Sequence, residues 1–405
     1  MRVMQRMTKQ FFIIVLGLLV IGNVAAETTA DKTIIVSAPK PSDTIPLLIP
    51  SPPDINAKGY VLLDADSGYI IAQKDPDKRM PPASLTKLMT LYLIADALKN
   101  GQISLDDKVR ISKKAWRIGG SKMFVKQGNN VPVSKLIQGI IVASGNDATV
   151  AMAEYIGGDE QSFVSIMNQT AASLDMNNTH YTDSNGLPEK NHYTAPIDLA
   201  KLTRAWVSNF PEYYPWFKQK WIIHNGIKQP NRNRLLWRDP SVDGLKTGHT
   251  SSAGYCLVVS AERDGIRLIS VVMGSPTDSA RANGSEALLN YGFRFYETHK
   301  LYASNTPLTT PRVWFGKNNT SNLGLAKDLY ITIPKGQYKH IKAIISLNET
   351  LNAPIVKGQV CGAVKIFLND KEITEQPLVA LQENPKGGLW SRFVDHIGLF
   401  FHKFI

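Results

Sequence analysis

Cysteine is scarce in this sequence of 405 residues, which contains only Cys256 and Cys361. The two form no Cys-x-x-Cys pair, and the eight histidines form no His-Glu-x-x-His string. A disulfide framework and a zinc site of the usual spacing are therefore excluded. We expect two buried, unpaired thiols, no metal and no cofactor.

The sequence also lacks an apolar run near its start that is long enough to span a bilayer comfortably. Residues 11–21 form an apolar stretch of eleven residues, which follows three basic residues and precedes the small residues 24–26. That order is typical of a cleaved export signal, so we expect residues 1–26 to be removed. A membrane anchor is the alternative interpretation.

Acidic residues are outnumbered by basic ones, 34 to 46, which gives a formal net charge of +12. A basic chain suits nucleic acid, an anionic membrane surface or an anionic substrate. No run of Lys and Arg with interleaved aromatic residues occurs. An exported protein also meets little nucleic acid, so we expect no nucleic-acid partner. Loss of residues 1–26 would lower the charge to +9, because they include three basic and no acidic residues.

The length suits two folded domains. Residues 27–55 hold a cluster of prolines and are expected to form an extended tether or a surface belt. Residues 56–298 have strand patterns early and late with helical patterns between them, which predicts an α+β domain whose sheet is completed by distant segments. Residues 299–385 predict a small all-β domain. Expected helices in the first domain are 85–98, 134–141, 148–156, 163–174 and 284–296, with a hairpin at 59–72 and strands at 242–260 and 266–273.

The last segment, residues 386–405, predicts an amphipathic helix. Apolar residues recur at spacings of three and four: Leu389, Trp390, Phe393, Val394, Ile397, Phe400, Phe401 and Phe404. Polar residues interleave on the other side: Arg392, Asp395, His396 and Lys403. We expect this helix to lie in a membrane surface. Docking on its own domain is the alternative.

Ser84-Leu85-Thr86-Lys87 begins a helical pattern and is the first candidate for catalysis. Residues three apart share a helix face, which places Lys87 beside Ser84. A serine hydroxyl needs a base to act as a nucleophile, and a buried lysine with a lowered pKa can be that base. Backbone N–H groups at a helix start favour an oxyanion. Alone the motif is weak, because serine is an ordinary helix cap.

Ser144-Gly145-Asn146 interrupts two apolar helical stretches and predicts a loop between packed helices. Its hydroxyl is suited to relay a proton, and its amide is suited to orient a substrate. The Ser-x-Asn pattern by itself is weak evidence, since Ser346-Leu347-Asn348 has the same pattern.

Lys246-Thr247-Gly248-His249-Thr250 leads into a β-pattern. The glycine allows another backbone to approach closely. Lys246 and the threonine hydroxyls suit a carboxylate.

Ser-x-x-Lys, Ser-x-Asn and Lys-Thr-Gly in this order are typical of penicillin-binding proteins and class A β-lactamases. With these motifs, the late β-region and the terminal helix, residues 55–405 resemble the D-alanyl-D-alanine carboxypeptidases of the penicillin-binding protein 5 type. The resemblance implies a serine β-lactamase-like catalytic domain with an antiparallel sheet and a helical subdomain, followed by an all-β domain.

The resemblance also implies the roles of the motif residues. Ser84 would be the acylated nucleophile and Lys87 its general base, while Ser144 and Asn146 would assist proton transfer and hold the substrate amide. The residues implied for substrate binding are Lys246, Thr247 and Gly248, His249 with an oxyanion-hole N–H beside that of Ser84, and Arg232 for the terminal carboxylate. Arg234 is close enough in sequence to leave the choice of arginine open.

The expected activity is removal of the terminal D-alanine from peptidoglycan pentapeptide stems at the periplasmic face of the inner membrane. β-Lactams would acylate the same serine. A catalytically weak penicillin-binding scaffold is one alternative. A β-lactamase is another, but no Glu-x-x-Leu-Asn string lies between the second and third motifs, and Gly145 stands where the lactamases have Asp.

Overall fold

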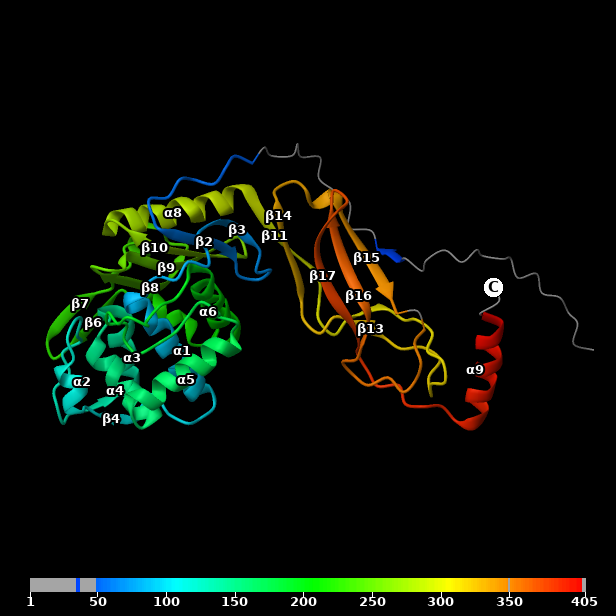
Figure 1. Cartoon of the computed structure of the whole chain (residues 1–405), viewed down its shortest axis with the longest axis horizontal. Coiled ribbons are helices and arrows are strands. Elements are labelled where there is room, and N and C mark those ends of the chain that lie inside the picture. Colours follow the sequence, from blue (N-terminus) through cyan, green and yellow to red (C-terminus); the bar gives the residue numbers. More distant parts are fainter. Residues whose placement is uncertain (1–33, 37–48, 349, 403–405) are drawn as a thin grey trace, which may run out of the picture. The chain divides into compact units, whose positions relative to one another are not determined.

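The structure is a computed structural model that describes residues 34–36, 49–348 and 350–402 (Figure 1). The described chain divides into two compact units. The larger unit holds residues 49–304 and 327–341, and the smaller holds residues 34–36, 305–326 and 342–402. The predicted signal, residues 1–26, lies outside the described residues.

A five-stranded antiparallel sheet in the order β3-β2-β10-β9-β8 forms the centre of the larger unit. Its strands are β2 Gly59–Asp64, β3 Ile70–Lys74, β8 Val242–Thr250, β9 Gly254–Arg263 and β10 Ile266–Ser275. The predicted hairpin is confirmed as β2 and β3. Val61 pairs with Val271, which joins this hairpin to the late strands. The prediction that distant segments complete the sheet is therefore confirmed.

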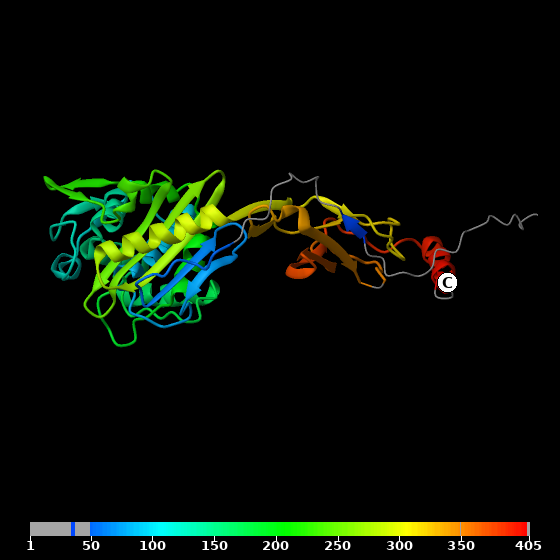
Figure 2. The same ribbon diagram turned by 90° about the horizontal axis from the view of Figure 1, so that it is seen from above.

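Successive side chains of a strand point to opposite faces, and a buried core packs against each face of this sheet. Leu62 packs in one core with Leu288 of helix α8, Asp278–Phe295, which lies across the strands (Figure 2). Val61 belongs to the second core, which includes Leu88 and lies on the side of the other helices (Figure 1).

The other helices of the larger unit are α1 Lys87–Lys99, α2 Lys113–Arg117, α3 Val133–Gln138, α4 Asn146–Gly157, α5 Glu160–Ser173, α6 Pro196–Asn209 and α7 Leu235–Arg238. The helix expected at 134–141 is α3 continued by a π-helical turn, Gly139–Ala143, and it stops where Ser144 takes a left-handed φ of 56°. Helix α6 was not expected from the sequence. Its signal was Pro196, since proline favours the first turn of a helix.

Three two-stranded ribbons complete the larger unit: β4 Lys108–Arg110 with β5 Asn130–Pro132, β6 Trp221–His224 with β7 Ile227–Pro230, and β11 Tyr296–Tyr302 with β14 Leu329–Pro334. Strand β14 lies in the range expected for the all-β domain. It groups with the larger unit because its partner β11 directly follows α8.

The smaller unit is built on a sheet in the order β1-β15-β16-β17-β13-β12. Its strands are β1 Ile34–Val36, β12 Pro307–Thr309, β13 Leu323–Gly324, β15 Ile341–Leu347, β16 Val360–Leu368 and β17 Lys371–Ala380. Strand β1 comes from the proline-rich segment and pairs antiparallel with β15 at the sheet edge. Cys361 on β16 and Cys256 on β9 are buried and unpaired, as expected.

Helix α9, Leu389–His402, contacts its own unit through polar groups. Asp395 is buried, and it accepts hydrogen bonds from Arg312 at 3.0 Å and from the Phe315 backbone N–H at 2.7 Å. Large apolar side chains of the same helix are exposed: Leu389 85%, Trp390 77%, Phe393 57%, Val394 50% and Ile397 47%. None of the described helices combines the length and hydropathy needed to cross a membrane.

Candidate active site

All three sequence motifs meet at one hollow of the larger unit, with a volume of about 530 Å³. It is lined by Ser84, Ser121, Ser144, Pro230, Asn231, Arg232, Arg234, Thr247, Gly248, His249, Tyr255, Asp278 and Arg281. Of the other predicted site residues, Lys87 bonds to Ser84 and Lys246 bonds to Ser144.

Ser84 lies in a 3-10 turn, Ala83–Thr86, directly before α1. The turn is pressed between two segments that need glycine. A Cβ on Gly248 of β8 would lie 2.9 Å from the Pro82 carbonyl oxygen, and one on Gly186 would lie 1.8 Å from that of Ala83. The predicted close approach at Gly248 is thus confirmed. It brings β8 against the turn that carries the serine.

Lys87 is completely buried beneath Ser84. Its Nζ lies 3.0 Å from Ser84 Oγ and donates a 2.5 Å hydrogen bond to the Asn185 carbonyl oxygen. Burial lowers the pKa of Lys87 to about 7, although the carboxylate of Asp183 opposes this shift. A neutral amine that donates to Asn185 keeps its lone pair for the hydroxyl of Ser84, which is the arrangement a general base requires.

Ser144 and Lys246 form a second serine–lysine pair. Lys246 Nζ lies 2.9 Å from Ser144 Oγ and 2.9 Å from the Thr247 carbonyl oxygen. Burial first, and then the positive charges of Lys87 and arginines, hold the pKa of Lys246 well below its usual value. A substrate carboxylate beside Lys246 would favour its ammonium form again.

Asn146 begins α4 and is almost fully buried. Its Nδ2 donates to the Gly119 carbonyl oxygen at 2.7 Å, and its backbone N–H donates to that of Ser121 at 2.7 Å. These bonds fasten the loop that carries Ser121 to the second motif, so one wall of the hollow is tied to Ser144.

The side chain of the next residue, Asp147, holds the segment that follows Ser121 in place. Its buried carboxylate accepts backbone N–H bonds from Met123 at 2.9 Å, Phe124 at 2.8 Å, Val125 at 3.1 Å and Ala148 at 2.9 Å. No role for Asp147 was expected from the sequence, since the residues around it do not indicate that a distant loop supplies backbone donors.

The two arginines left open by the sequence make different contacts. Arg232 Nη1 donates to Ser121 Oγ at 2.8 Å. Arg234 Nε lies 2.6 Å from Asp278 Oδ2, so its charge is already paired. A third arginine, Arg281, was missed, and its Nη1 donates to the Gly248 carbonyl oxygen at 2.9 Å beneath β8. His249 is exposed at the rim, with its ring centroid 4.0 Å from that of Tyr255.

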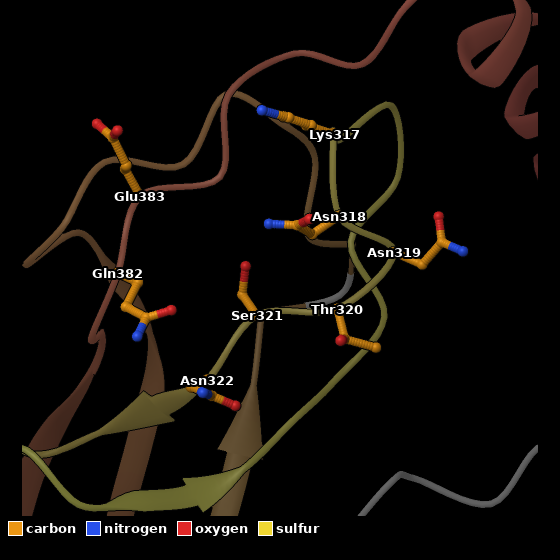
Figure 3. Close-up of a pocket in the computed structure, with 8 residues that line it drawn as sticks. All are labelled: Lys317, Asn318, Asn319, Thr320, Ser321, Asn322, Gln382 and Glu383. Carbon is orange, nitrogen blue, oxygen red and sulfur yellow. The ribbon is translucent and has the colours of Figure 1, made fainter.

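A second hollow, of about 520 Å³, lies in the smaller unit (Figure 3). Its lining is polar: Lys317, Asn318, Asn319, Thr320, Ser321, Asn322, Gln382 and Glu383. The side chains of Asn318 and Ser321 point into the space between the two chain segments. No serine–lysine hydrogen bond is found among these residues, whereas the first hollow has the Ser84–Lys87 and Ser144–Lys246 contacts.

Comparison with known families agrees with this geometry. Residues 48–277 match the family described as D-alanyl-D-alanine carboxypeptidase, and residues 296–386 match the penicillin-binding protein 5 C-terminal domain. D-alanyl-D-alanine carboxypeptidase DacA of Escherichia coli K12 is 43% identical over 386 residues, which cover 93% of this chain and 96% of that protein. The DacA protein of Haemophilus influenzae is 42% identical and covers 86% of this chain and 90% of its own length.

Solved structures place the fold in the same family. Penicillin-binding protein 5 from Haemophilus influenzae has a TM-score of 0.80 at 43% identity, covering 83% of this chain and 99% of its own. Penicillin-binding protein D2 from Listeria monocytogenes, in an ampicillin-bound form, has a TM-score of 0.55 at 30% identity and covers 59% of this chain and 98% of its own. The predicted α+β fold with an all-β domain is confirmed. The chain belongs to the D-alanyl-D-alanine carboxypeptidase family of penicillin-binding serine peptidases.

Proposed function

We propose that Ser84 is the nucleophile of this carboxypeptidase and Lys87 its general base. Ser84 Oγ attacks the carbonyl carbon between the last two D-alanines of a peptidoglycan pentapeptide stem, and its proton passes to Lys87. The observation that carries this proposal is the buried amine 3.0 Å from Ser84 Oγ, whose pKa is lowered to about 7. Such an amine is unprotonated in a large share of molecules near neutral pH.

Collapse of the tetrahedral intermediate breaks the peptide bond, and the departing D-alanine nitrogen must gain a proton. The Ser144–Lys246 pair can deliver this proton. The Ser144 hydroxyl borders the hollow and would donate its proton to the nitrogen, and Lys246 would then reprotonate Ser144. The acyl group remains on Ser84 as an ester. Lys87 first gives up the proton taken from Ser84, and Lys246 regains the one it supplied through Ser144. Water then attacks the ester with Lys87 accepting its proton, and this proton returns to Ser84 Oγ as the ester bond breaks and the shortened stem leaves.

Recognition of the substrate is assigned to the remaining motif residues. Thr247 and Arg232 line the hollow and would bind the terminal carboxylate together with Lys246. Asn146 would hold the substrate amide. The backbone N–H groups of Ser84 and His249 would stabilise the oxyanion. β-Lactams would acylate Ser84 by the same attack.

The test compares wild type with Ser84→Ala on a D-Ala-D-Ala-terminated peptide and on benzylpenicillin. Wild type should release D-alanine and gain the mass of one penicillin, and Ser84→Ala should do neither. Ser208→Ala is the matched control, because Ser208 is an exposed serine on α6. Equal D-alanine release by wild type and Ser84→Ala would rule out the proposed nucleophile.

We also propose that residues 1–26 direct export to the periplasm and that α9 then lies in the surface of the inner membrane. Support comes from a difference between the two faces of the helix, since one is held by polar contacts and the other is exposed. Asp395 is tied to Arg312 and Phe315, while Trp390 and Phe393 are largely exposed. A helix held by its polar side presents its apolar side outward, as an interfacial helix must.

Sedimentation with vesicles containing phosphatidylglycerol tests the membrane proposal. Chain 27–405 should bind, and Phe393→Asp should bind several-fold less, because a charge would enter the apolar face. Val356→Asp is the control, since Val356 is 61% exposed in the same unit but lies outside α9. Equal losses in both variants, or none in Phe393→Asp, would refute an α9 anchor.

A further inference from the structure

His192 is a buried histidine outside the three motifs. Its Nε2 lies 2.8 Å from Thr86 Oγ1, within the turn that carries Ser84. Its Nδ1 accepts the backbone N–H of Thr182 at 3.2 Å and lies 3.1 Å from the Thr182 hydroxyl oxygen. One imidazole therefore spans the gap between the nucleophile's turn and the loop 182–186 that faces it.

The contacts of His192 determine which ring nitrogen carries the proton. A backbone N–H can only donate, so we assign Nδ1 as the acceptor of the Thr182 N–H, and the Thr182 hydroxyl can donate to the same nitrogen. The proton of the neutral ring is then on Nε2, which donates to Thr86 Oγ1. A second proton would place an N–H on Nδ1 against the N–H of Thr182. It would also attract Oδ2 of Asp183, which is 3.6 Å away.

The loop that His192 holds carries the carbonyl group to which Lys87 donates. Asp183 Oδ1 accepts backbone N–H bonds from Asn185 at 2.8 Å and Gly186 at 2.6 Å, and so shapes the turn. The Asn185 carbonyl in that turn lies 2.5 Å from Lys87 Nζ. A change in His192 therefore acts on the same carboxylate that sets the position of the Asn185 carbonyl.

We propose that neutral His192 is a positioning residue for acylation: it holds the Asn185 carbonyl in place for Lys87, and its protonation slows the attack of Ser84. This inference rests on the proposed roles of Ser84 and Lys87. It adds an element outside the three motifs.

The groups around the ring set the conditions for this effect. Burial lowers the pKa of His192, the carboxylate of Asp183 opposes the shift, and the charges of His180 and Lys87 lower it further. The ring of Tyr181 packs edge-on at 5.7 Å, and burial raises the pKa of that phenol, so it stays neutral. His192 is therefore neutral at pH 7, and its protonation belongs to the acid range below its ordinary pKa of about 6.5.

The test measures the second-order rate of acylation by benzylpenicillin, followed by intact mass, from pH 5 to pH 9. His192→Ala should lower the rate at pH 8 by about 10- to 100-fold, since a misplacement of about 1 Å costs on the order of 100-fold. His192→Gln should restore most of that loss, because its amide donates and accepts like the neutral ring. His396→Gln is the control, as His396 is an exposed histidine in the smaller unit.

The pH profile separates positioning from a merely structural role. In wild type and His396→Gln, the plot of log rate against pH should steepen from a slope of one towards two in acid. In His192→Gln the slope should stay at one. A slope of one in wild type, a His192→Ala rate equal to wild type, or failure of glutamine to rescue would overturn the inference. Near-UV circular dichroism identifies a variant that fails to fold, and the slopes of wild type and His192→Gln then decide. Absence of acylation in wild type would instead refute the proposed function.

Discussion

Lys87 Nζ lies 2.5 Å from the carbonyl oxygen of Asn185, and this contact orients the amine towards Ser84. An amine held by one donated hydrogen bond has its lone pair directed elsewhere. The ammonium formed after proton transfer can keep the same bond. The geometry therefore serves both protonation states that a base passes through.

The rate of acylation should rise with pH through about 7, where Lys87 loses its proton. Between pH 6 and pH 7 the rate should rise about fivefold, because an amine with a pKa of about 7 goes from about one-tenth to one-half neutral and only the neutral amine accepts the proton of Ser84. Stopped-flow measurement of acylation by benzylpenicillin gives this dependence of the rate on pH. If the acylation rate instead rises only around the ordinary lysine pKa of about 10.4, the assignment of Lys87 as the base is contradicted.

Lys87→Met should abolish acylation and change how stability depends on pH. Burial lowers the pKa of Lys87 in the folded protein, so the unfolded chain binds more protons between about pH 7 and the ordinary lysine pKa. Wild-type stability should therefore rise across this window relative to the variant, by on the order of 1 kcal/mol per pH unit. Urea unfolding at pH 7.5 and 9.5 measures the difference.

A matched control for that experiment is Lys78→Met, because the Lys78 side chain is 54% exposed. Its stability difference from wild type should stay the same at both pH values. If Lys87→Met also gives the same difference at pH 7.5 and 9.5, the folded-state pKa of Lys87 is not lowered.

Asp147→Ala should lower the free energy of unfolding by several kcal/mol. The change removes the acceptor of the backbone N–H groups of Met123, Phe124 and Val125, and each loss at the buried Met123 and Val125 costs about 1–3 kcal/mol. Asp147→Asn should also destabilise, since its NH₂ group would face donors. Denaturant unfolding measures both, with Asp106→Asn on the exposed surface as control. A loss below about 1 kcal/mol would contradict the proposed anchoring role.

Arg232→Gln should reduce kcat/KM for a D-Ala-D-Ala peptide by about 10- to 100-fold, the value of one hydrogen bond to a charged group. Arg234→Gln should have a smaller effect, because Asp278 already pairs with Arg234. Steady-state D-alanine release measures both. A peptide ending in D-alaninamide lacks the carboxylate, so the difference between wild type and Arg232→Gln should vanish with it. A larger loss in Arg234→Gln would reverse the assignment.

Local patterns were sufficient for much of the fold. The hairpin β2–β3, helix α1 and the late strands β8 to β10 each follow from apolar periodicity and turn residues within short windows. The three motifs were recognisable for the same reason, since residues close in sequence have fixed spacing on a helix or strand. The motif residues were thereby identified before their distances were known.

Other features depend on partners that are distant in sequence. The side chains of Asp147, His192 and Arg281 are ordinary polar residues until backbone groups from other segments meet them. The polar side of α9 likewise acquires meaning only when Asp395 meets Phe315.

The residue types of the three motifs, their order and the local elements on which they lie can be read from the amino-acid sequence. Only the folded chain shows that the Asn185 carbonyl contacts Lys87 and that Lys246 reaches Ser144. Every residue has a backbone carbonyl group, so the amino-acid sequence does not indicate which carbonyl group contacts Lys87. Burial, which lowers the pKa of both lysines, is likewise a property of the packed chain.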